Sequence, residues 1–399
     1  MLKNLFSTLF ENEPTKWGNG ISALWSGMSL NLYSKSLFNN NSLEFEKHQF
    51  EFESARAAIF HYLKFKNIST NDEVMLCSFT CDAVSDAVKA TGCNLVYIDV
   101  NSDLSMNFEN IVSKINNKTK LLICQNTFGI SGLKINEFKE LRKLNIAILL
   151  DNCLSYGTTC FLDDHLFDAC VYSFEVSKII CVGWAGILEV PKNQIINFKD
   201  YHSKLDSVSF YEDLRRVFQT YLNLIFVGNG GILTKFFWYL FFFLKIFRKS
   251  SASSINFLKT KRLGFFSSKI LLNVLRSKES IFSKTKKNFT HFFHYTQNLG
   301  YRTVHRTINI NNVVSCRLPL LIDESKKDDF INLALKKYKL EIGLWFDKFP
   351  ENDMDKNQFC NTSNILPCIV NIPCYWTLTK NEIHKVNSFL KFFINNNVK

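Results

Sequence analysis

Proline is scarce in this chain of 399 residues, with 6 copies, and no proline-rich linker or tail is present. Paired CxxC elements are also lacking, because the 12 cysteines are scattered along the chain. The spacing of Cys77 and Cys81 alone is weak evidence for a metal site, so we expect free thiols and no bound metal. The first residues, MLKNLFSTLFENEP, have a very short apolar stretch and include Glu11 and Glu13. They make a poor signal peptide, and we expect a cytoplasmic protein.

No apolar run is long enough to cross a bilayer, which needs about 20 residues. The most aromatic segment, FFWYLFFFLKIF, runs from Phe236 to Phe247 and is interrupted by Lys245. Two interpretations of it have similar weight. It is a buried helix or subunit interface, or it is a helix that lies in the membrane surface with its basic neighbours on lipid phosphates.

Basic residues exceed acidic ones, with a formal net charge of +12, but they form no basic run. Such a charge attracts nucleic acid, anionic lipid or phosphorylated small molecules. Zinc-finger spacings and RNP-like aromatic motifs are lacking, so we expect no nucleic-acid partner. A hydrophobic content of 46% supports a buried core, and the length suits a large domain with a smaller one.

Strand and helix patterns alternate from about residue 50 to 190, with short connections. Helical spacing occurs at 54–68, 81–92, 107–115 and 134–145. Short apolar strands are predicted within 71–84, 93–100, 119–129, 146–153, 169–176 and 184–190. This order predicts an α/β fold, a mostly parallel sheet covered by helices. In such sheets the chemistry gathers at the carboxyl ends of the strands, here Ser78–Thr80, Asn126–Thr127, Asp151 and Ser173–Lys178.

Composition changes suggest three parts. An irregular N-terminal segment covers 1–50, and a large domain covers 51–260, in which 191–260 is a divergent, aromatic insertion. A smaller C-terminal α/β domain covers 261–399. It begins with a long helical pattern to Leu299, continues with strand-rich stretches at 313–322 and 360–376, and closes with a helix at 379–393.

Lys178 stands in an otherwise apolar stretch between two predicted strands. A lone lysine there is most often a residue whose stem is buried and whose charge reaches water. Asp151 weakens that interpretation, because it ends the apolar strand IAILLD, where an acid is costly without a cation. A desolvated lysine can form a Schiff base, and a buried carboxylate can hold a pyridinium nitrogen protonated. Together the two residues favour a pyridoxal phosphate site.

Several blocks of the chain resemble the DegT/DnrJ/EryC1/StrS aminotransferases, the sugar aminotransferase branch of the fold-type I pyridoxal phosphate enzymes. They are SARAAIFHYLK, NDEVMLCSFTCDAVSDAVKATGCNLVYIDV, TKLLICQNTFGISG, AILLDNCLSYG and DACVYSFEVSKIICVGWAGIL, and the similarity returns in GFFSSKILLNVL and ILPCIVNIPCYWTLTKNEI. The resemblance implies a large domain with a seven-stranded-type sheet, and a homodimer with active sites at the interface.

Site roles follow from this resemblance. Lys178 matches the lysine that forms the Schiff base with the cofactor and later moves protons. Asp151 matches the acid on the pyridine nitrogen, and Ser173 matches a phosphate ligand. Ser54, Ala55 and Arg56 match the turn that holds the phosphate at a helix start, where free N–H groups favour an anion. For Ser54 by itself, an ordinary helix cap is the simpler interpretation.

Three positions depart from the family pattern. Leu154 stands where His or Gln is usual near the cofactor's 3′ oxygen, and an apolar side chain makes no hydrogen bond there. Cys81 stands where many members place an aromatic ring over the pyridine. Asn126 stands where one branch has His, and it can still donate a hydrogen bond.

Three functions compete. The first is a pyridoxal-phosphate-dependent aminotransferase that moves an amino group, with glutamate as the expected donor, onto a nucleotide- or lipid-linked keto-sugar for polysaccharide or secondary-metabolite synthesis. The second is a cofactor-binding but catalytically impaired relative with a regulatory or partner-binding role, which Leu154 favours. The third is a peripheral membrane scaffold that uses the 236–247 segment, which the presence of Lys178, Asp151 and Ser173 together disfavours.

Overall fold

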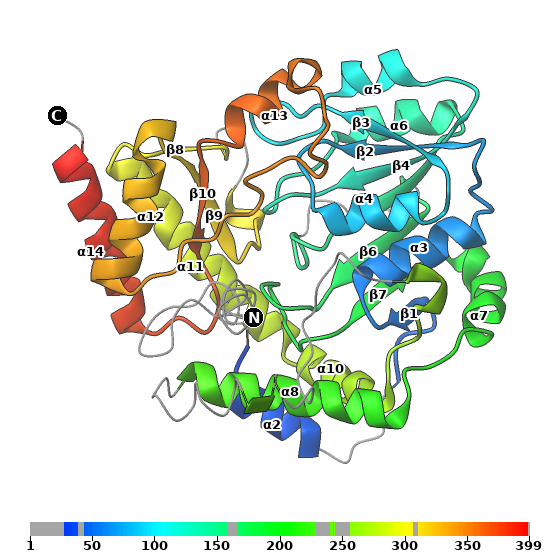
Figure 1. The fold of residues 1–399 in the computed structure, drawn as a ribbon, viewed down its shortest axis with the longest axis horizontal. Coiled ribbons are helices and arrows are strands. Elements are labelled where there is room, and N and C mark those ends of the chain that lie inside the picture. Colours follow the sequence, from blue (N-terminus) through cyan, green and yellow to red (C-terminus); the bar gives the residue numbers. More distant parts are fainter. Residues whose placement is uncertain are drawn as a thin grey trace.

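The structure is a computed structural model that describes residues 28–38, 44–158, 166–228, 240, 241, 243, 256–305 and 310–397. Its centre is a seven-stranded sheet of order β1-β7-β6-β5-β4-β2-β3 (Figure 1). The strands from β2 to β6 are parallel, and β7 runs antiparallel to both β6 and β1. Their bounds are Gln49–Phe52 (β1), Glu73–Cys77 (β2), Asn94–Ile98 (β3), Thr119–Gln125 (β4), Ala147–Asp151 (β5), Ala169–Ser173 (β6) and Gly186–Glu189 (β7).

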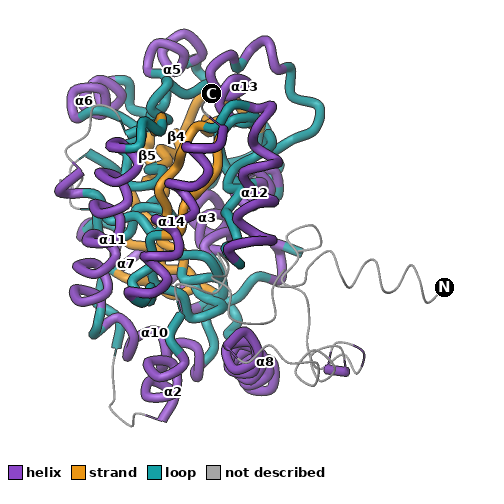
Figure 2. The backbone as a smooth tube through the Cα atoms, turned by 90° about the vertical axis from the view of Figure 1, so that its left-hand side faces the viewer, coloured by secondary structure: helices purple, strands orange, loops and turns teal. Residues whose placement is uncertain are grey.

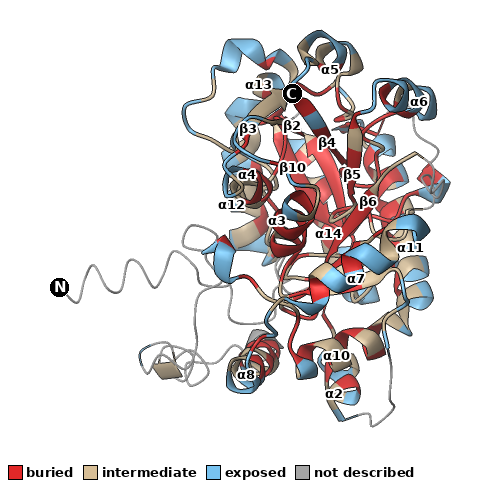
Figure 3. Ribbon diagram, turned by 90° about the vertical axis from the view of Figure 1, so that its right-hand side faces the viewer, coloured by how far each residue is buried: buried red, intermediate tan, exposed pale blue. Residues whose placement is uncertain are grey.

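Helices cover both faces of this sheet, because the strands are apolar on both sides. In β4, Leu121 and Ile123 face one apolar cluster while Leu122 and Cys124 face the other. The first face packs on α3 (Ala55–Phe65), α4 (Asp82–Lys89) and α7 (Ile195–Ser203). The second packs on α5 (Phe108–Lys114), α6 (Ile135–Lys143) and α10 (Phe265–Leu275). Figure 2 shows the strands enclosed by helices, and Figure 3 shows β4, β5 and β6 buried.

A second sheet lies in the C-terminal part. It is antiparallel, of order β10-β9-β8, with bounds Arg302–Thr303 (β8), Arg317–Leu321 (β9) and Ile369–Pro373 (β10). Helices α11 (Lys278–Asn298), α12 (Glu324–Tyr338) and α14 (Lys380–Asn397) share an apolar cluster with it. The remaining helices are α2 (Leu30–Phe38), α8 (Phe210–Gly228) and the short α13 (Cys360–Ile365). Helices α2, α8 and α10 contact one another at one end of the molecule.

The predicted fold class is confirmed, and the six strands expected between 71 and 190 are β2 to β7. Two expectations about local structure are wrong. The helical pattern from 265 to 299 is two helices, because the chain leaves α10 at Arg276 and restarts at Ser277. The stretch 360–376 begins with a helix, α13, whose first amides are held by Asp99 of the large sheet, and its strand starts at Ile369. The three domain boundaries stay predictions.

The aromatic segment from Phe236 to Phe247 lies outside the described residues, apart from Leu240, Phe241 and Phe243. Among the residues that the structure describes, no helix combines the length and hydrophobicity that crossing a membrane requires.

Candidate active site

A cavity lies at the carboxyl edge of the large sheet, where β5 and β6 end beside the starts of α3 and α4. It encloses about 80 Å³. Seven of the nine predicted site residues line it, namely Ala55, Arg56, Cys81, Asp151, Leu154, Ser173 and Lys178. Residues that are 123 positions apart in the chain therefore meet at one site, as the strand-end argument predicts.

The start of α3 forms one wall of the cavity. Ser54 caps this helix, its hydroxyl accepting a hydrogen bond from the Ala57 amide at 3.2 Å, so it lies beneath the wall and not in it. Ala55 and Arg56 do line the cavity. Gly186 lets β7 pass close to the start of α3, since a Cβ at this position would lie 2.4 Å from the Ala55 nitrogen. The helix start offers its positive end to the cavity.

Arg56 adds a cation to the same wall. One of its terminal nitrogens, Nη2, lies 3.7 Å from Glu175 Oε2, a long ion pair. The other, Nη1, is buried and has no hydrogen-bond partner within the described part of the chain. The side chain of Ser173, at the end of β6, makes no hydrogen bond to another described residue either. The wall therefore presents an unsatisfied cation, a free hydroxyl and a helix start, which together suit an anion such as phosphate.

Asp151 and Lys178 form the opposite part of the site. Asp151 is 3% exposed, and its Oδ1 accepts a hydrogen bond from the Cys153 amide at 3.0 Å. Lys178 makes no ion pair or hydrogen bond with any residue that the structure describes. Burial raises the pKa of the Cys153 thiol well above its ordinary value; Asp151 adds to this and Lys178 opposes it. One thiol thus responds to both charges, which places the carboxylate and the ammonium in the same small space.

Cys81 lies at the start of α4, on the same side of the cavity as the wall that contains Arg56. Burial raises the pKa of its thiol to about 11, although the Lys178 ammonium opposes this. The thiol is therefore protonated and acts as a small apolar surface, and not as a nucleophile. Leu154, 7% exposed, is a second apolar surface of the cavity.

The structure turns the side chain of Asn126 away from the site. It is buried, donates a hydrogen bond to Asn152 Oδ1 at 2.6 Å and accepts one from the Gly132 amide at 2.8 Å. Its neighbour Gln125 lines the cavity instead. Gln125 pairs in register with Asp151, and register partners point to the same face of a sheet. Side chains two residues apart along β4 point to the same face, so this alternation would have selected Gln125.

Two further lining residues had no signal in the sequence. Glu175 follows the Ser173 strand end and meets Arg56, and Phe346 comes from the C-terminal part and packs edge-on against Phe79 at 5.4 Å. The cavity is smaller than typical ligand pockets, which hold about 300–1,000 Å³. A ring-sized ligand therefore requires an apolar lining side chain, Phe346 or Leu154, to turn aside.

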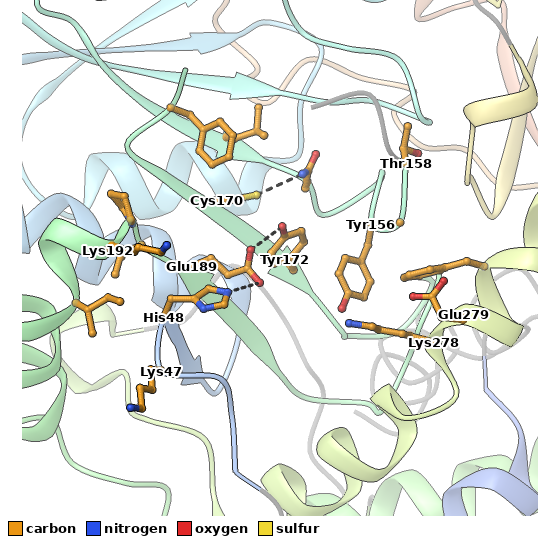
Figure 4. Close-up of a pocket in the computed structure, with 18 residues that line it drawn as sticks. Lys47, His48, Tyr156, Thr158, Cys170, Tyr172, Glu189, Lys192, Lys278 and Glu279 are labelled. Atoms are coloured by element: carbon orange, nitrogen blue, oxygen red, sulfur yellow. Dashed lines mark hydrogen bonds and ion pairs between the residues drawn. The ribbon is translucent and has the colours of Figure 1, made fainter. Parts of the chain in front are cut away.

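A larger cavity of about 600 Å³ lies on the other face of the same strands (Figure 4). Cys170 and Tyr172 of β6 line it, whereas Ser173 points to the lysine site, because successive side chains alternate. Its central acid, Glu189, is satisfied by Tyr172 at 2.9 Å and Gln49 at 2.7 Å. None of the predicted site residues lines this cavity. The volume of a cavity therefore does not by itself identify the active site. The polar groups without partners around Lys178 identify it.

The fold is that of the fold-type I pyridoxal phosphate transferases. Residues 40–205 match the model of the DegT/DnrJ/EryC1/StrS aminotransferase family. The resemblance seen in the sequence is thereby confirmed. A curated relative is GDP-perosamine synthase of Escherichia coli O157:H7, 26% identical over 125 residues, which are 30% of this chain and 34% of the relative. The chain thus matches about a third of that relative's length.

Solved structures share the fold over nearly the whole chain. NtdA from Bacillus subtilis, solved with the bound cofactor PMP, is 15% identical with a TM-score of 0.64 and covers 99% of this chain and 82% of its own. PseC from Helicobacter pylori, an aminotransferase of pseudoaminic acid biosynthesis, is 13% identical with a TM-score of 0.64, covering 92% and 96%. A family member from Brucella abortus is 14% identical with a TM-score of 0.66, covering 91% and 95%.

Proposed function

We propose that this protein is a pyridoxal-phosphate-dependent aminotransferase that places an amino group on a keto-sugar. The observation that supports this best is the set of polar groups that meet in one cavity. Arg56 Nη1 is buried without a partner, and Lys178 and Ser173 line the same cavity beside the buried Asp151 carboxylate. A buried charge or donor without a partner is costly, so such a set indicates a ligand that satisfies it.

The donor set fits the cofactor. The start of α3, Arg56 and Ser173 would hold its phosphate, Asp151 its ring nitrogen, and Lys178 its aldehyde carbon. When bound, the cofactor would supply an electron sink for bond breaking next to the transferred nitrogen. Lys178 Nζ, the titratable amine that lines the cavity, would move the proton. Cys81 and Leu154 would help to exclude water from the cavity.

The acceptor is proposed as a sugar because GDP-perosamine synthase and PseC are named for sugar chemistry. We propose a nucleotide- or lipid-linked keto-sugar, with glutamate as donor, in a cytoplasmic homodimer. Exposed apolar side chains on α8, namely Tyr211, Leu214 and Phe218, support an interface between copies. A membrane contact through the segment from Phe236 to Phe247 concerns residues outside the described ones and stays a prediction.

The test compares the visible absorbance of the purified protein with added pyridoxal phosphate against that of Lys178→Ala. Lys192→Ala, a lysine of the larger cavity, is the matched control. We expect an absorbance band that Lys178→Ala loses and Lys192→Ala keeps. Glutamate should then change the band, and transfer of ¹⁵N to a nucleotide-linked keto-sugar should follow.

Each outcome discriminates between functions. A lysine-dependent band without any transfer supports the impaired relative, in which Leu154 leaves one cofactor oxygen unbonded. A folded protein without a lysine-dependent band contradicts both and leaves the scaffold.

A further inference from the structure

The larger cavity, on the other face of the strands that form the lysine site, has the volume and the lining of a ligand site. It encloses about 600 Å³, and the rings of Tyr156, Phe167, Tyr172 and Phe282 form part of its wall. Ligand pockets usually hold about 300–1,000 Å³ and combine apolar walls with a few polar groups. The chemistry proposed for the lysine site uses none of these rings, so this cavity calls for an explanation of its own.

Tyr156 offers both a ring and a hydrogen-bond donor to the cavity. Its ring centre lies 4.8 Å from that of Tyr172 and 5.1 Å from that of Phe282. Burial raises the pKa of Tyr156, and the carboxylates of Glu189 and Glu279 add to this, so its hydroxyl stays protonated. The hydroxyl makes no hydrogen bond to another described residue. The aromatic wall therefore presents ring faces and one free O–H group.

Three lysines surround this wall without a partner. Lys47, Lys192 and Lys278 line the cavity and make no ion pair or hydrogen bond with any other residue that the structure describes. Lys47 and Lys192 lie at one end of the cavity, and Lys278 lies at the other end, beside Tyr156 (Figure 4). The cavity thus has positive charge at both ends of an aromatic wall.

Two carboxylates also line the cavity, and neither cancels this charge. Glu189 accepts hydrogen bonds from Tyr172 at 2.9 Å and from Gln49 at 2.7 Å. His48 Nε2 also lies 3.9 Å from Glu189 Oε1. Glu279 stands in the first turn of α11, where the positive end of the helix favours a carboxylate. The three lysines therefore remain available to an anion.

We propose that this cavity is a second ligand site and that it binds a nucleoside diphosphate. A planar base stacks on aromatic ring faces. The lysine ammonium is a compact point charge that suits phosphate oxygens. A diphosphate carries several negative charges, so it matches separate lysines better than a single carboxylate does. This inference does not depend on the proposed aminotransferase function.

The two cavities lie back to back on the same strands. Leu150 and Asn152 line the larger cavity, whereas Asp151 between them lines the smaller one, because side chains alternate along a strand. Tyr172 and Ser173 are divided between the two cavities in the same way. A nucleotide in the larger cavity therefore does not occupy the cofactor's place, and the two binding events can be measured separately.

The test is titration calorimetry of the full chain with ADP, GDP, CDP and UDP, with and without pyridoxal phosphate. Adenosine, which lacks the charge, and pyrophosphate, which lacks the ring, are titrated in the same way. Lys192→Ala removes a lysine of the cavity, and its control Lys199→Ala removes an exposed lysine of α7 that does not line it. Ile195→Trp fills the cavity, and its control Ile196→Trp places the same ring on a residue that is 81% exposed and outside the cavity.

We expect at least one of the four diphosphates to bind. Lys192→Ala should weaken this binding about 10-fold, through the loss of a charged hydrogen bond, while Lys199→Ala leaves it unchanged. Ile195→Trp should abolish the binding, and Ile196→Trp should retain it. Adenosine and pyrophosphate should each bind at least about 10-fold more weakly, since each lacks one half of the contacts. Increasing concentrations of pyridoxal phosphate should not displace the nucleotide.

Three results overturn the inference. The first is that none of the four diphosphates binds. The second is that the nucleotide binds elsewhere, shown by displacement with pyridoxal phosphate or by unchanged affinity in the cavity variants that thermal unfolding shows to be folded. The third is that pyrophosphate binds as tightly as the nucleotides, which means that the rings play no part. A missing lysine-dependent absorbance band contradicts only the proposed function, so the two failures are distinguishable.

Discussion

Two regions of the molecule each bury an arginine against a tryptophan, and they balance its charge differently. Arg216 in α8 lies 5.0 Å from the Trp184 ring and pairs with Glu53 at 2.7 Å and Glu212 at 3.2 Å. Arg317 in β9 lies 3.5 Å from the Trp345 ring and pairs with no acid in the described structure. The first arginine has acid partners within the fold, and the second has none among the described residues. The two arginines therefore share stacking on a tryptophan and differ in their acid partners.

The arginine pair itself gives the largest expected effect. Arg216→Gln leaves the half-buried Glu53 without its cation, while Glu212 keeps Arg215, and it should lower the free energy of unfolding by about 3–5 kcal/mol. Arg317→Gln removes a charge that no described acid balances, so it should lower the free energy of unfolding by less than Arg216→Gln does. Urea unfolding followed by circular dichroism measures both. Equal losses of unfolding free energy in the two variants would contradict the difference between the two arginines.

Glu212 offers a related measurement on the compensated side. Burial alone would raise its pKa, but the hydrogen bond from Arg215 and the charges of Arg215 and Arg216 lower the pKa to about 2. The Arg216 contact is part of that network, so Arg216→Gln should move the Glu212 pKa upward toward its ordinary value. An acid-unfolding midpoint that shifts to higher pH in this variant would support the assignment.

Two buried histidines, His202 and His305, are expected to make the stability of the protein depend on pH in the same way. Burial lowers the pKa of His202, in α7, and of His305, beside the small sheet, to about 4 each. The unfolded chain takes up a proton near pH 6.5 and the folded chain only near pH 4. Stability should be full above pH 6.5 and fall by about 3 kcal/mol per histidine as the pH drops to 4. His305→Gln, whose amide can still donate to the Phe128 carbonyl, should remove its share of that loss. Urea unfolding at pH 7 and pH 5 decides this; an unchanged difference between the two pH values contradicts it.

A buried aspartate at a helix start in each region gives a smaller effect. Asp213 accepts from the Phe266 amide at 2.6 Å at the start of α10, and Asp99 accepts from the Thr362 amide at 3.0 Å at the start of α13. Asp→Asn at either position keeps the shape and loses the charge at the helix start, which should cost about 1–2 kcal/mol. Thermal unfolding should show similar losses for the two. A loss confined to Asp213→Asn would mean that α13 does not depend on the large sheet.

Leu154→His gives the smallest expected change. The histidine supplies a hydrogen-bond donor where the cavity has an apolar wall, so the cofactor's absorbance maximum should move while the protein stays folded. Spectra of the two proteins with pyridoxal phosphate measure this. An unmoved maximum would show that position 154 does not reach the cofactor's ring oxygen.

Much of the site was predictable because strand ends are local features. Asp151 ends an apolar strand and Ser173 ends the next, and parallel strands bring such residues to one edge whatever the rest of the chain does. Asn126 was predicted from a family position, and the structure has Gln125 line the cavity in its place, as the alternation along the strand explains. Helix breaks such as Arg276–Ser277 were not predictable, since the apolar spacing continues through them.

The sequence by itself determined the α/β order, the mostly parallel sheet and the meeting of Lys178 with Asp151 and Ser173. Only the tertiary structure decided which polar groups stay unsatisfied. The neighbours of Arg317 in space include residues more than a hundred positions away in the chain, such as Ser177. The local sequence therefore does not predict whether an acid lies beside it. Arg216 takes Glu212 from its own helix, a pairing that the spacing in the sequence allows, but the packing of distant elements gave it Glu53 and left Arg317 without an acid among the described residues.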